Sequence, residues 1–334
     1  MISALKNISK KKLALIGIAI VFLTIFILYT VSPSRHITTG AWTEGLFDAT
    51  DQSLHPEKLL ELEELVGHKF SIAHYYRGWE ALADPNLIAE FELLRSHGWE
   101  PMLNVNPYFF QECVHSDATL YKAIARGDCD QFLRTAGKNL SQINQPFYLL
   151  FAWEMNNRDL EWSINYSGST PSEFVSAWQR IHTIFKEEDA TNIVWVFSPN
   201  TEDSTSVSYS ELYPGDDFVD WIGIDGYNWG STQSWSQWKS FAEVFTPSYE
   251  HLVRIAPDKP LMIAEVNTTD QGGNKSAWYT DMFLKQIPYH FPKIQAIIIY
   301  NEDRTPSEKV NWKIDITPES LSAFSSGINS KYYR

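Results

Sequence analysis

Eight short runs of apolar residues recur along the chain, and several of them end on acidic or amide side chains. The runs cover residues 37–42, 69–76, 100–107, 147–154, 192–199, 219–227, 261–267 and 296–302. They are rich in branched and aromatic residues, a pattern typical of strands that are buried on both faces. We therefore predict eight strands.

Helical patterns lie between these runs. Apolar side chains recur at helical spacing after Pro56 and again after Pro85, and a proline fits the first turn of a helix. The segment Thr170-Pro171-Ser172-Glu173 combines a capping threonine with a glutamate three positions later, which predicts a capped helix start. Further helices are expected near residues 119–140, 235–256, 274–290 and 318–326, with mostly loop at 200–218.

The alternation of strands and helices predicts a parallel sheet. A count of eight strands favours closure into one (β/α)8 barrel, the TIM barrel, over an open doubly wound sheet. No glycine-rich nucleotide loop, neither G-x-G-x-x-G nor G-x-x-x-x-G-K-S/T, follows any of the runs. We therefore predict an α/β protein with a single barrel domain over residues 37–330 and no nucleotide site.

The N-terminus differs from the rest of the chain. A basic segment, residues 1–12, precedes residues 13–31, which carry no charge and as a helix reach roughly 28 Å, close to the thickness of a bilayer core. Because no A-x-A cleavage pattern follows, an uncleaved transmembrane signal-anchor is favoured over a signal peptide. The lysines predict a cytoplasmic N-terminus and, after a linker at residues 32–36, an extracytoplasmic domain. Cleavage of this segment would make the protein secreted.

Composition narrows the possible partners. The formal net charge of -14 argues against nucleic acid, because neutralising phosphates takes clustered Lys and Arg. Aromatic residues make up 14% of the chain, and although most belong to a core, their faces also suit sugar rings. The adjacent acids Asp216 and Asp217 lack the ligand spacing of a calcium loop, so we expect neither a metal nor a cofactor. We also expect a monomer.

The two cysteines and several asparagines leave alternatives open. Cys113 and Cys129 can close a disulfide loop outside the cytoplasm, or they can remain two free thiols. N-x-S/T triplets, which are glycosylated only on accessible loops in a glycosylating host, begin at Asn139, Asn165, Asn267 and Asn274.

Two glutamates stand where strands of a barrel end. Glu154 closes the fourth run and Glu265 closes the seventh, and catalytic groups of such barrels lie at the C-terminal ends of the strands. From strands four and seven their carboxyls can approach within the ~5–5.5 Å of a retaining glycosidase, rather than the ~6.5–9.5 Å of an inverting one. A single glutamate at a strand end is more often a helix cap or a surface ion-pair residue. The pair, with Tyr227 between them in the sequence, favours catalysis.

Five segments carry a family resemblance. FAWEMN, SAWQRIHTIFKEEDATNIVWVFSPN, YPGDDFVDWIGIDGYNW, KPLMIAEVN and IIIYNED…NWKID resemble, in this order and spacing, the second half of glycoside hydrolase family 26. That family holds the β-mannanases and lichenases of the 4/7 (β/α)8 superfamily. The likeness runs from about residue 147 to 316, and the upstream segments HGWEPMLNVNP and GAWTEG resemble the family's third and first strands more loosely.

The resemblance implies roles for particular residues. Glu154 falls on the family's acid/base, Glu265 on its nucleophile, and Tyr227 on a tyrosine that holds the nucleophile in place. Two positions depart from the family: Trp153 stands where a histidine usually precedes the acid/base, and Ile299-Tyr300 stands where a tryptophan usually floors the sugar site. The substrate contacts therefore differ from the family pattern, or the site is altered.

Further side chains near the strand ends are candidates to contact sugar. They are Trp153, Asn156, His74, Trp229, Trp162, Tyr300 and Asn301, with Trp42 and Trp79 as additional stacking candidates. Each aromatic is individually more typical of ordinary packing, and His74 fits a structural role about as well. Asp225 is expected only to orient backbone.

These observations predict a retaining, endo-acting glycoside hydrolase that cleaves a β-linked polysaccharide by double displacement. The family resemblance implies β-mannan or mixed-linkage β-glucan, and an exopolysaccharide fits an anchored enzyme equally well. The alternative is a catalytically silent barrel that binds polysaccharide in a synthesis or export apparatus. The partners expected are thus the polysaccharide and, through residues 13–31, a membrane.

Overall fold

A closed barrel of eight parallel strands forms the protein. The computed structural model describes residues 36–107, 113, 117–201 and 207–334. In these ranges the barrel strands are β1 (Thr38–Thr43), β4 (Ile72–Gly78), β5 (Glu100–Asn106), β6 (Phe147–Phe151), β7 (Ile193–Phe197), β8 (Trp221–Asn228), β9 (Leu261–Thr268) and β10 (Ile294–Asn301). Each strand pairs with its neighbours in chain order, and β10 closes the barrel on β1. The prediction of a (β/α)8 barrel is confirmed, strand by strand.

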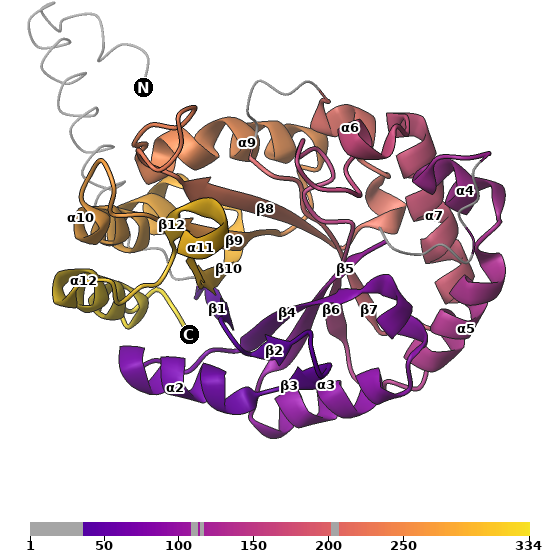
Figure 1. Ribbon diagram of the computed structural model, residues 1–334, viewed down its shortest axis with the longest axis horizontal. Coiled ribbons are helices and arrows are strands. Elements are labelled where there is room, and N and C mark those ends of the chain that lie inside the picture. The colour runs from indigo at the N-terminus through magenta and orange to yellow at the C-terminus, as the bar shows by residue number, and fades with distance from the viewer. Residues whose placement is uncertain (1–35, 108–112, 114–116, 202–206) are drawn as a thin grey trace, which may run out of the picture. The chain divides into compact units, whose positions relative to one another are not determined.

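Helices surround the strands on the outside, as Figure 1 shows. The α-helices are α2 (Pro56–Val66), α3 (Asn86–Ser96), α4 (Leu120–Arg126), α5 (Asp130–Leu140), α6 (Ile164–Ser167), α7 (Pro171–Glu187), α8 (Tyr209–Leu212), α9 (Phe241–Ile255), α10 (Lys275–Asp281), α11 (Thr305–Glu308) and α12 (Pro318–Ile328). A π-helix, η4 (Met282–His290), continues α10, and 3₁₀ turns lie at η2 (Trp79–Ala83) and η3 (Asp216–Phe218). Two small hairpins, β2 (Phe47–Asp48) with β3 (Ser53–Leu54) and β11 (Asp303–Arg304) with β12 (Val310–Asn311), follow β1 and β10.

Most predicted helices form where they were expected. The capping box that starts α7 is present, because Glu173 N donates to Thr170 Oγ1 at 3.2 Å and Thr170 N donates to the Glu173 carboxylate at 2.8 Å. The helix expected near residues 119–140 is instead two helices, α4 and α5. The break falls at Gly127, whose φ of 99° is a left-handed conformation that ends a helix readily.

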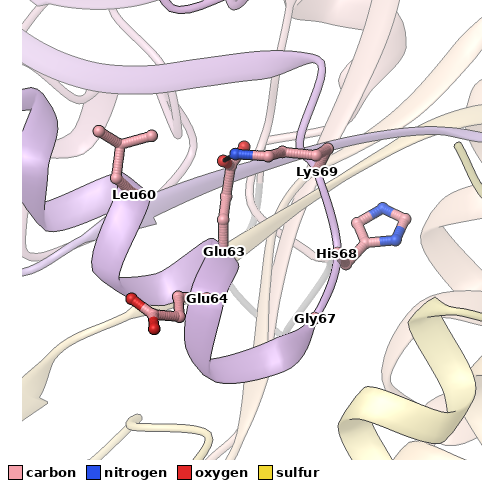
Figure 2. A pocket seen from close by; sticks show the side chains of 6 residues that line it. All are labelled: Leu60, Glu63, Glu64, Gly67, His68 and Lys69. Carbon is pink, nitrogen blue, oxygen red and sulfur yellow. Dashed lines mark hydrogen bonds and ion pairs between the residues drawn. The ribbon is translucent and has the colours of Figure 1, made fainter.

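One buried carboxylate fastens α2 to the strand that follows it. Figure 2 shows the hollow at the end of α2, lined by Leu60, Glu63, Glu64, Gly67, His68 and Lys69. The side chains of Glu63 and Lys69 point toward one another, and the second carboxylate oxygen of Glu63 accepts from Phe70 N and Trp99 Nε1, both at 2.9 Å. This hollow lies at the N-terminal end of β4, so it belongs to the base of the barrel rather than to the end where Glu154 and Glu265 lie.

The structure bears on the cysteines and on two of the glycosylation triplets, whereas the predicted anchor lies outside the described residues. Cys113 and Cys129 form a disulfide, which settles the choice between a bridge and free thiols. Asn139 and Asn267 are 6% and 1% exposed, so these two triplets do not begin on accessible asparagines. Within the described ranges no helix is both long and apolar enough to cross a bilayer. The anchor predicted at residues 13–31 lies outside those ranges, as does the basic segment before it.

Candidate active site

A tight turn after β6 carries Glu154 into the mouth of the barrel. The strand ends at Phe151, three residues earlier than the sequence predicts, and Ala152 and Glu154 adopt φ values of 50° and 52°. Left-handed backbone costs roughly 1–2 kcal/mol for a residue with a Cβ, and such strain is concentrated at functional sites. Hydrogen bonds from Ala152 N to Val105 O (2.9 Å) and from Glu154 N to Ser198 O (2.7 Å) hold the turn.

Two amide groups hold the carboxyl group of Glu154. Asn200 Nδ2 lies 2.5 Å from Glu154 Oε1, and Asn157 Nδ2 lies 2.7 Å from Oε2. Asn156 in turn fixes Asn200, because its amide accepts from Asn200 N (2.9 Å) and donates to Asn200 O (3.1 Å). Asn156, predicted as a sugar contact, is 5% exposed and uses its side chain to hold this loop.

A bulge in β9 sets the direction of Glu265. Ile263 pairs with Ile224 on β8, but the next β8 residue, Asp225, pairs with Glu265, so Ala264 is an extra residue in β9. The pairing with β10 shifts across the same stretch. A β-bulge turns the side chains that follow it, and bulges are frequent beside active sites. The bulge thereby places the Glu265 carboxyl in the barrel mouth, where it is 4% exposed.

Three donors surround the carboxyl group of Glu265. Tyr227 Oη donates to Oε2 at 2.6 Å, while Tyr76 Oη (2.7 Å) and Asn104 Nδ2 (3.2 Å) both donate to Oε1. Tyr76 and Asn104 are register partners on β4 and β5, which explains why they reach the same oxygen. The predicted contact between Tyr227 and Glu265 is therefore present, and two further donors accompany it.

The carboxyl groups of the site influence one another. Burial raises the pKa of Glu154, and its two amide partners oppose that rise. Burial, and after it the charge of Glu154, raises the pKa of Glu265, whereas the hydroxyls of Tyr227 and Tyr76 lower it. The two acids thus lie close enough to disfavour simultaneous ionisation.

A third acid, Asp225, lies beside Glu265 as its register partner on β8. It is fully buried, and burial together with the charges of Glu265 and Glu154 raises its pKa well above the usual range. Its Oδ1 accepts from Ser198 Oγ at 3.0 Å. The sequence analysis expected Asp225 only to orient backbone, but its carboxyl group also interacts electrostatically with Glu265 and Glu154.

His74 lies beside Glu265 without charge. Its Nε2 is 4.0 Å from Glu265 Oε1, and burial lowers the pKa of the imidazole to about 3. The ring packs against Tyr76 at 4.7 Å between centroids. His74, one of the predicted sugar contacts, is 0% exposed and forms part of the wall behind Glu265.

Trp153 and Trp162 form one aromatic pair of the site. Their ring centroids are 4.4 Å apart, and Trp162 Nε1 donates to Trp153 O at 2.7 Å. Trp153 also contacts Tyr76 at 5.3 Å, the tyrosine that binds Glu265. Trp153, which stands where the resembled family usually has a histidine, therefore packs against Tyr76 and has 8% of its surface exposed.

A second aromatic group lies around Tyr227. Trp312 packs against Tyr227 and against Trp229, with 4.9 Å between ring centroids in each case, and Tyr300 lies 5.6 Å from Tyr227. Trp312 follows β10, after the position where the family usually places a tryptophan. The sequence analysis named Tyr300 as a candidate sugar contact, and Trp312 is the tryptophan that the structure places against Tyr227.

The remaining predicted contacts are tied into the protein. Asn301 is 4% exposed, donates to Thr43 Oγ1 at 3.1 Å and accepts from Ile314 N at 2.9 Å. Trp42 donates through Nε1 to Glu302 at 3.1 Å, and Trp79 is fully buried against Phe132 and Phe151. A role of these residues in holding sugar stays a prediction.

Two aspartates of the β2–β3 hairpin and the histidine after it form a small polar cluster. In the ranges that the structure describes, ligand atoms of Asp48, Asp51 and His55 lie within 4.8 Å of one another. Both aspartates are exposed, and Asp48 and Asp51 accept hydrogen bonds from Thr50 N and Ser53 N. These turn contacts account for the arrangement, so we assign no metal there.

Comparison with known proteins decides the family. The model of glycosyl hydrolase family 26 matches residues 98–289, more than half of the chain. The chain belongs to glycosyl hydrolase family 26. The resemblance found in the sequence is thereby confirmed, and this family 26 protein carries Glu154 just after the fourth barrel strand and Glu265 in the C-terminal half of the seventh.

Relatives of this family 26 protein include glucan- and mannan-directed enzymes by name. Endoglucanase H of Acetivibrio thermocellus is 31% identical over 273 residues, 80% of this chain and 28% of that protein. A mannan endo-1,4-beta-mannosidase of Bacillus subtilis is 24% identical over 187 residues, 53% of this chain and 46% of that protein. The chain therefore spans less than half the length of either relative.

Solved structures support the fold of the family 26 barrel. A family 26 β-mannanase from Bacteroides ovatus superposes with a TM-score of 0.64 at 14% identity, covering 90% of each chain. The catalytic domain of a family 26 endo-β-1,4-mannanase from Bacillus sp. JAMB-750 gives 0.63 at 16% identity, covering 90% of this chain and 88% of that one. At these identities the likeness concerns the fold alone.

Proposed function

We propose that the protein is a retaining, endo-acting glycoside hydrolase that uses Glu265 as nucleophile and Glu154 as acid/base. The observation that carries the proposal is the pairing of two buried carboxyls, one in the turn after β6 and one in the C-terminal half of β9, each held by its own set of donors. Membership of family 26 supports the hydrolase class. The matching positions of the two glutamates support double displacement, in which one carboxyl attacks the sugar and the other moves the proton.

The hydrogen bonds support one assignment of the proton in the pair of glutamates. Double displacement begins with one carboxyl ionised and the other protonated, and the pair's mutual repulsion favours this state near neutral pH. Glu265 receives three donors, two of them phenols whose own pKa values are raised by burial and which therefore stay protonated. Glu154 receives two amide donors. The phenol donors oppose the rise in the pKa of Glu265, to about 8, that burial and the charge of Glu154 cause. On the strength of these donors we propose that the negative charge lies on Glu265 and the transferable proton on Glu154.

The substrate we propose is a β-linked polysaccharide, with mixed-linkage β-glucan first and β-mannan second. The order follows the relatives, because the endoglucanase matches a larger share of this chain at higher identity than the mannosidase does. An exopolysaccharide with similar linkages fits the same site. The partly exposed rings of Tyr227 and Trp229, which lie next to one another at the site, suit the faces of such sugars.

Hydrolysis of defined polysaccharides tests this proposal. We expect new reducing ends from mixed-linkage β-glucan or β-mannan, with a rapid fall in viscosity that marks internal cleavage. Proton NMR of the first product should show the β-anomer before mutarotation, since two displacements restore the configuration. Binding without new ends on glucan, mannan and exopolysaccharide substrates would instead identify the silent, polysaccharide-binding barrel.

Replacing Tyr227 by phenylalanine should weaken the enzyme and change its pH dependence. The hydroxyl lowers the pKa of Glu265, so its loss raises that pKa and moves the acidic limb of kcat/KM to higher pH. We expect kcat/KM to fall roughly 10- to 100-fold, because a hydrogen bond to a charged group contributes about 1.5–3 kcal/mol. The measurement is a pH profile of kcat/KM.

A matched control is available on the surface. Tyr213 Oη donates to Asp216 at 2.7 Å in the loop before β8, so Tyr213→Phe removes the same kind of bond outside the site. Its profile should overlay that of the parent. If the acidic limb of Tyr227→Phe also overlays the parent, Tyr227 does not set the ionisation of Glu265.

A further inference from the structure

One tryptophan of the protein is largely exposed. Trp235 has 71% of its surface accessible, the highest value among the large apolar side chains of the described residues. It lies in the loop between β8 and α9, at the end of the barrel that carries Glu154 and Glu265. An indole that remains in water at the edge of a site is an unused apolar surface, and such surfaces commonly mark binding sites.

Trp235 is the outer end of a continuous line of rings. Its ring lies 5.4 Å from Trp229, Trp229 lies 4.9 Å from Trp312, and Trp312 lies 4.9 Å from Tyr227, all between centroids. Tyr227 binds Glu265. The line therefore begins at the proposed nucleophile and ends in solvent.

The loop that carries this line is held at both ends by one side chain. Asn228 Oδ1 accepts from Gly230 N (3.2 Å) and from Lys239 N (2.9 Å), and its Nδ2 donates to Thr268 on β9 at 2.8 Å. Within the loop, Ser236 Oγ donates to Gly230 O at 2.8 Å. Trp235 therefore projects from a fastened loop, so its exposure is a property of a defined conformation.

Gly230 lets this loop pack closely against its neighbour. Its φ is 52°, and a Cβ at this position would lie 2.0 Å from Gln271 O, closer than any real contact. A hydrogen bond from Ser231 N to Gln271 O at 3.0 Å joins the backbones of the two segments. The loop is thereby fixed to the segment after β9, the strand of Glu265.

The same loop also reaches the segment that follows β10. Gln233 Nε2 donates to Glu308 O at the end of α11. The Glu308 side chain lies close enough to Glu154 to act on that carboxyl electrostatically. The exposed tryptophan therefore stands on a loop connected to the surroundings of both glutamates.

We propose that Trp229 and Trp235 form an outer sugar subsite that binds pyranose units of a β-linked chain beyond the bond being cleaved. The inference rests on the proposed function, since it assigns the ligand as a longer part of the same polysaccharide. A β-linked hexopyranose presents a flat C–H face that matches an indole ring, and covering that ring removes apolar surface from water. Trp312 is 2% exposed and packs against both Trp229 and Tyr227, so it supports these rings and does not itself face the sugar.

The test compares long and short substrates in the variant Trp235→Ala. We expect the ratio of kcat/KM for a β-linked hexasaccharide to that for the trisaccharide to fall about tenfold, mainly through KM, because only the longer chain reaches the outer ring. Trp235→Tyr should restore most of the ratio. The control Leu65→Ala removes another exposed apolar side chain, 43% accessible on α2 at the barrel wall, and should leave the ratio at the parent value.

Affinity electrophoresis in gels containing β-glucan or β-mannan separates this inference from the proposed function. If the parent protein is retarded in the gel but releases no reducing ends, the proposed hydrolysis is refuted. Loss of that retardation in Trp235→Ala would still support the subsite. An unchanged length ratio in an active Trp235→Ala, or equal retardation of variant and parent, overturns the subsite and leaves hydrolysis intact.

Discussion

Glu265→Ala should lose polysaccharide hydrolysis almost completely, with kcat reduced by roughly four orders of magnitude, or about 5.5 kcal/mol. Alanine cannot form the glycosyl-enzyme intermediate, and three donors that now face one carboxylate would face an empty space. Substrate binding should change far less, because the aromatic rings around the site remain. Reducing-end release and the affinity gel measure the two quantities separately.

The control for this result is Glu64→Ala. Glu64 lies on α2 and is exposed, so its removal tests the effect of losing a glutamate elsewhere on the barrel. We expect parent-like rates. Glu265→Ala should also show a cooperative melting transition, which distinguishes lost chemistry from lost folding. A Glu265→Ala protein that is folded and hydrolyses within tenfold of the parent would exclude Glu265 as nucleophile.

Glu154→Ala should show a loss that depends on the leaving group. On polysaccharide the departing oxygen needs a proton, so we expect kcat/KM to fall roughly a thousandfold, within the range that general acid catalysis supplies. An aryl glycoside with an acidic phenol departs without that proton, so formation of the glycosyl-enzyme should stay close to the parent rate. Pre-steady-state release of the phenol measures this step.

Rescue by azide, a small external nucleophile, provides a second test of the acid/base role of Glu154. With the carboxyl removed, azide can enter beside the intermediate and attack it without a general base, so azide should raise the steady-state rate on the aryl glycoside. The product should be the β-glycosyl azide, identified by NMR. Equal losses on both substrates, together with no azide product, would remove Glu154 from the acid/base role.

The architecture followed from the sequence because each barrel strand is a short apolar run between polar segments. A strand buried on both faces needs apolar residues at nearly every position, and alternation with helices leaves a parallel sheet as the simple solution. The end of β6 was placed too late. Ala152 and Trp153 continue the apolar run. Neither is a glycine or asparagine, the residues that usually indicate a left-handed conformation such as that of Ala152.

The candidate site was only partly predictable. Glu154, Glu265 and Tyr227 stand at strand ends, where position along the chain is enough to find them. The donors Tyr76 and Asn104 reach Glu265 through the pairing of β4 with β5 across the barrel, and register is not visible in one sequence. The extra residue in β9 that turns Glu265 inward is likewise a property of pairing with β8 and β10.

Asn228 lies where the strand that carries Tyr227 meets the loop that carries Trp235, and sequence changes in these two parts have different consequences. The side-chain amide of Asn228 bonds both ends of the loop that bears Trp235. The side chains between Ser231 and Trp238 can therefore vary while the two ends of the loop stay in place. We expect substitutions of exposed side chains there to leave β8 and Tyr227 in place, whereas Gln233 links the loop to α11 and is less free to change. The proposed preference for chain length can thus be altered through this loop, while the residues that hold Glu154 and Glu265 stay unchanged.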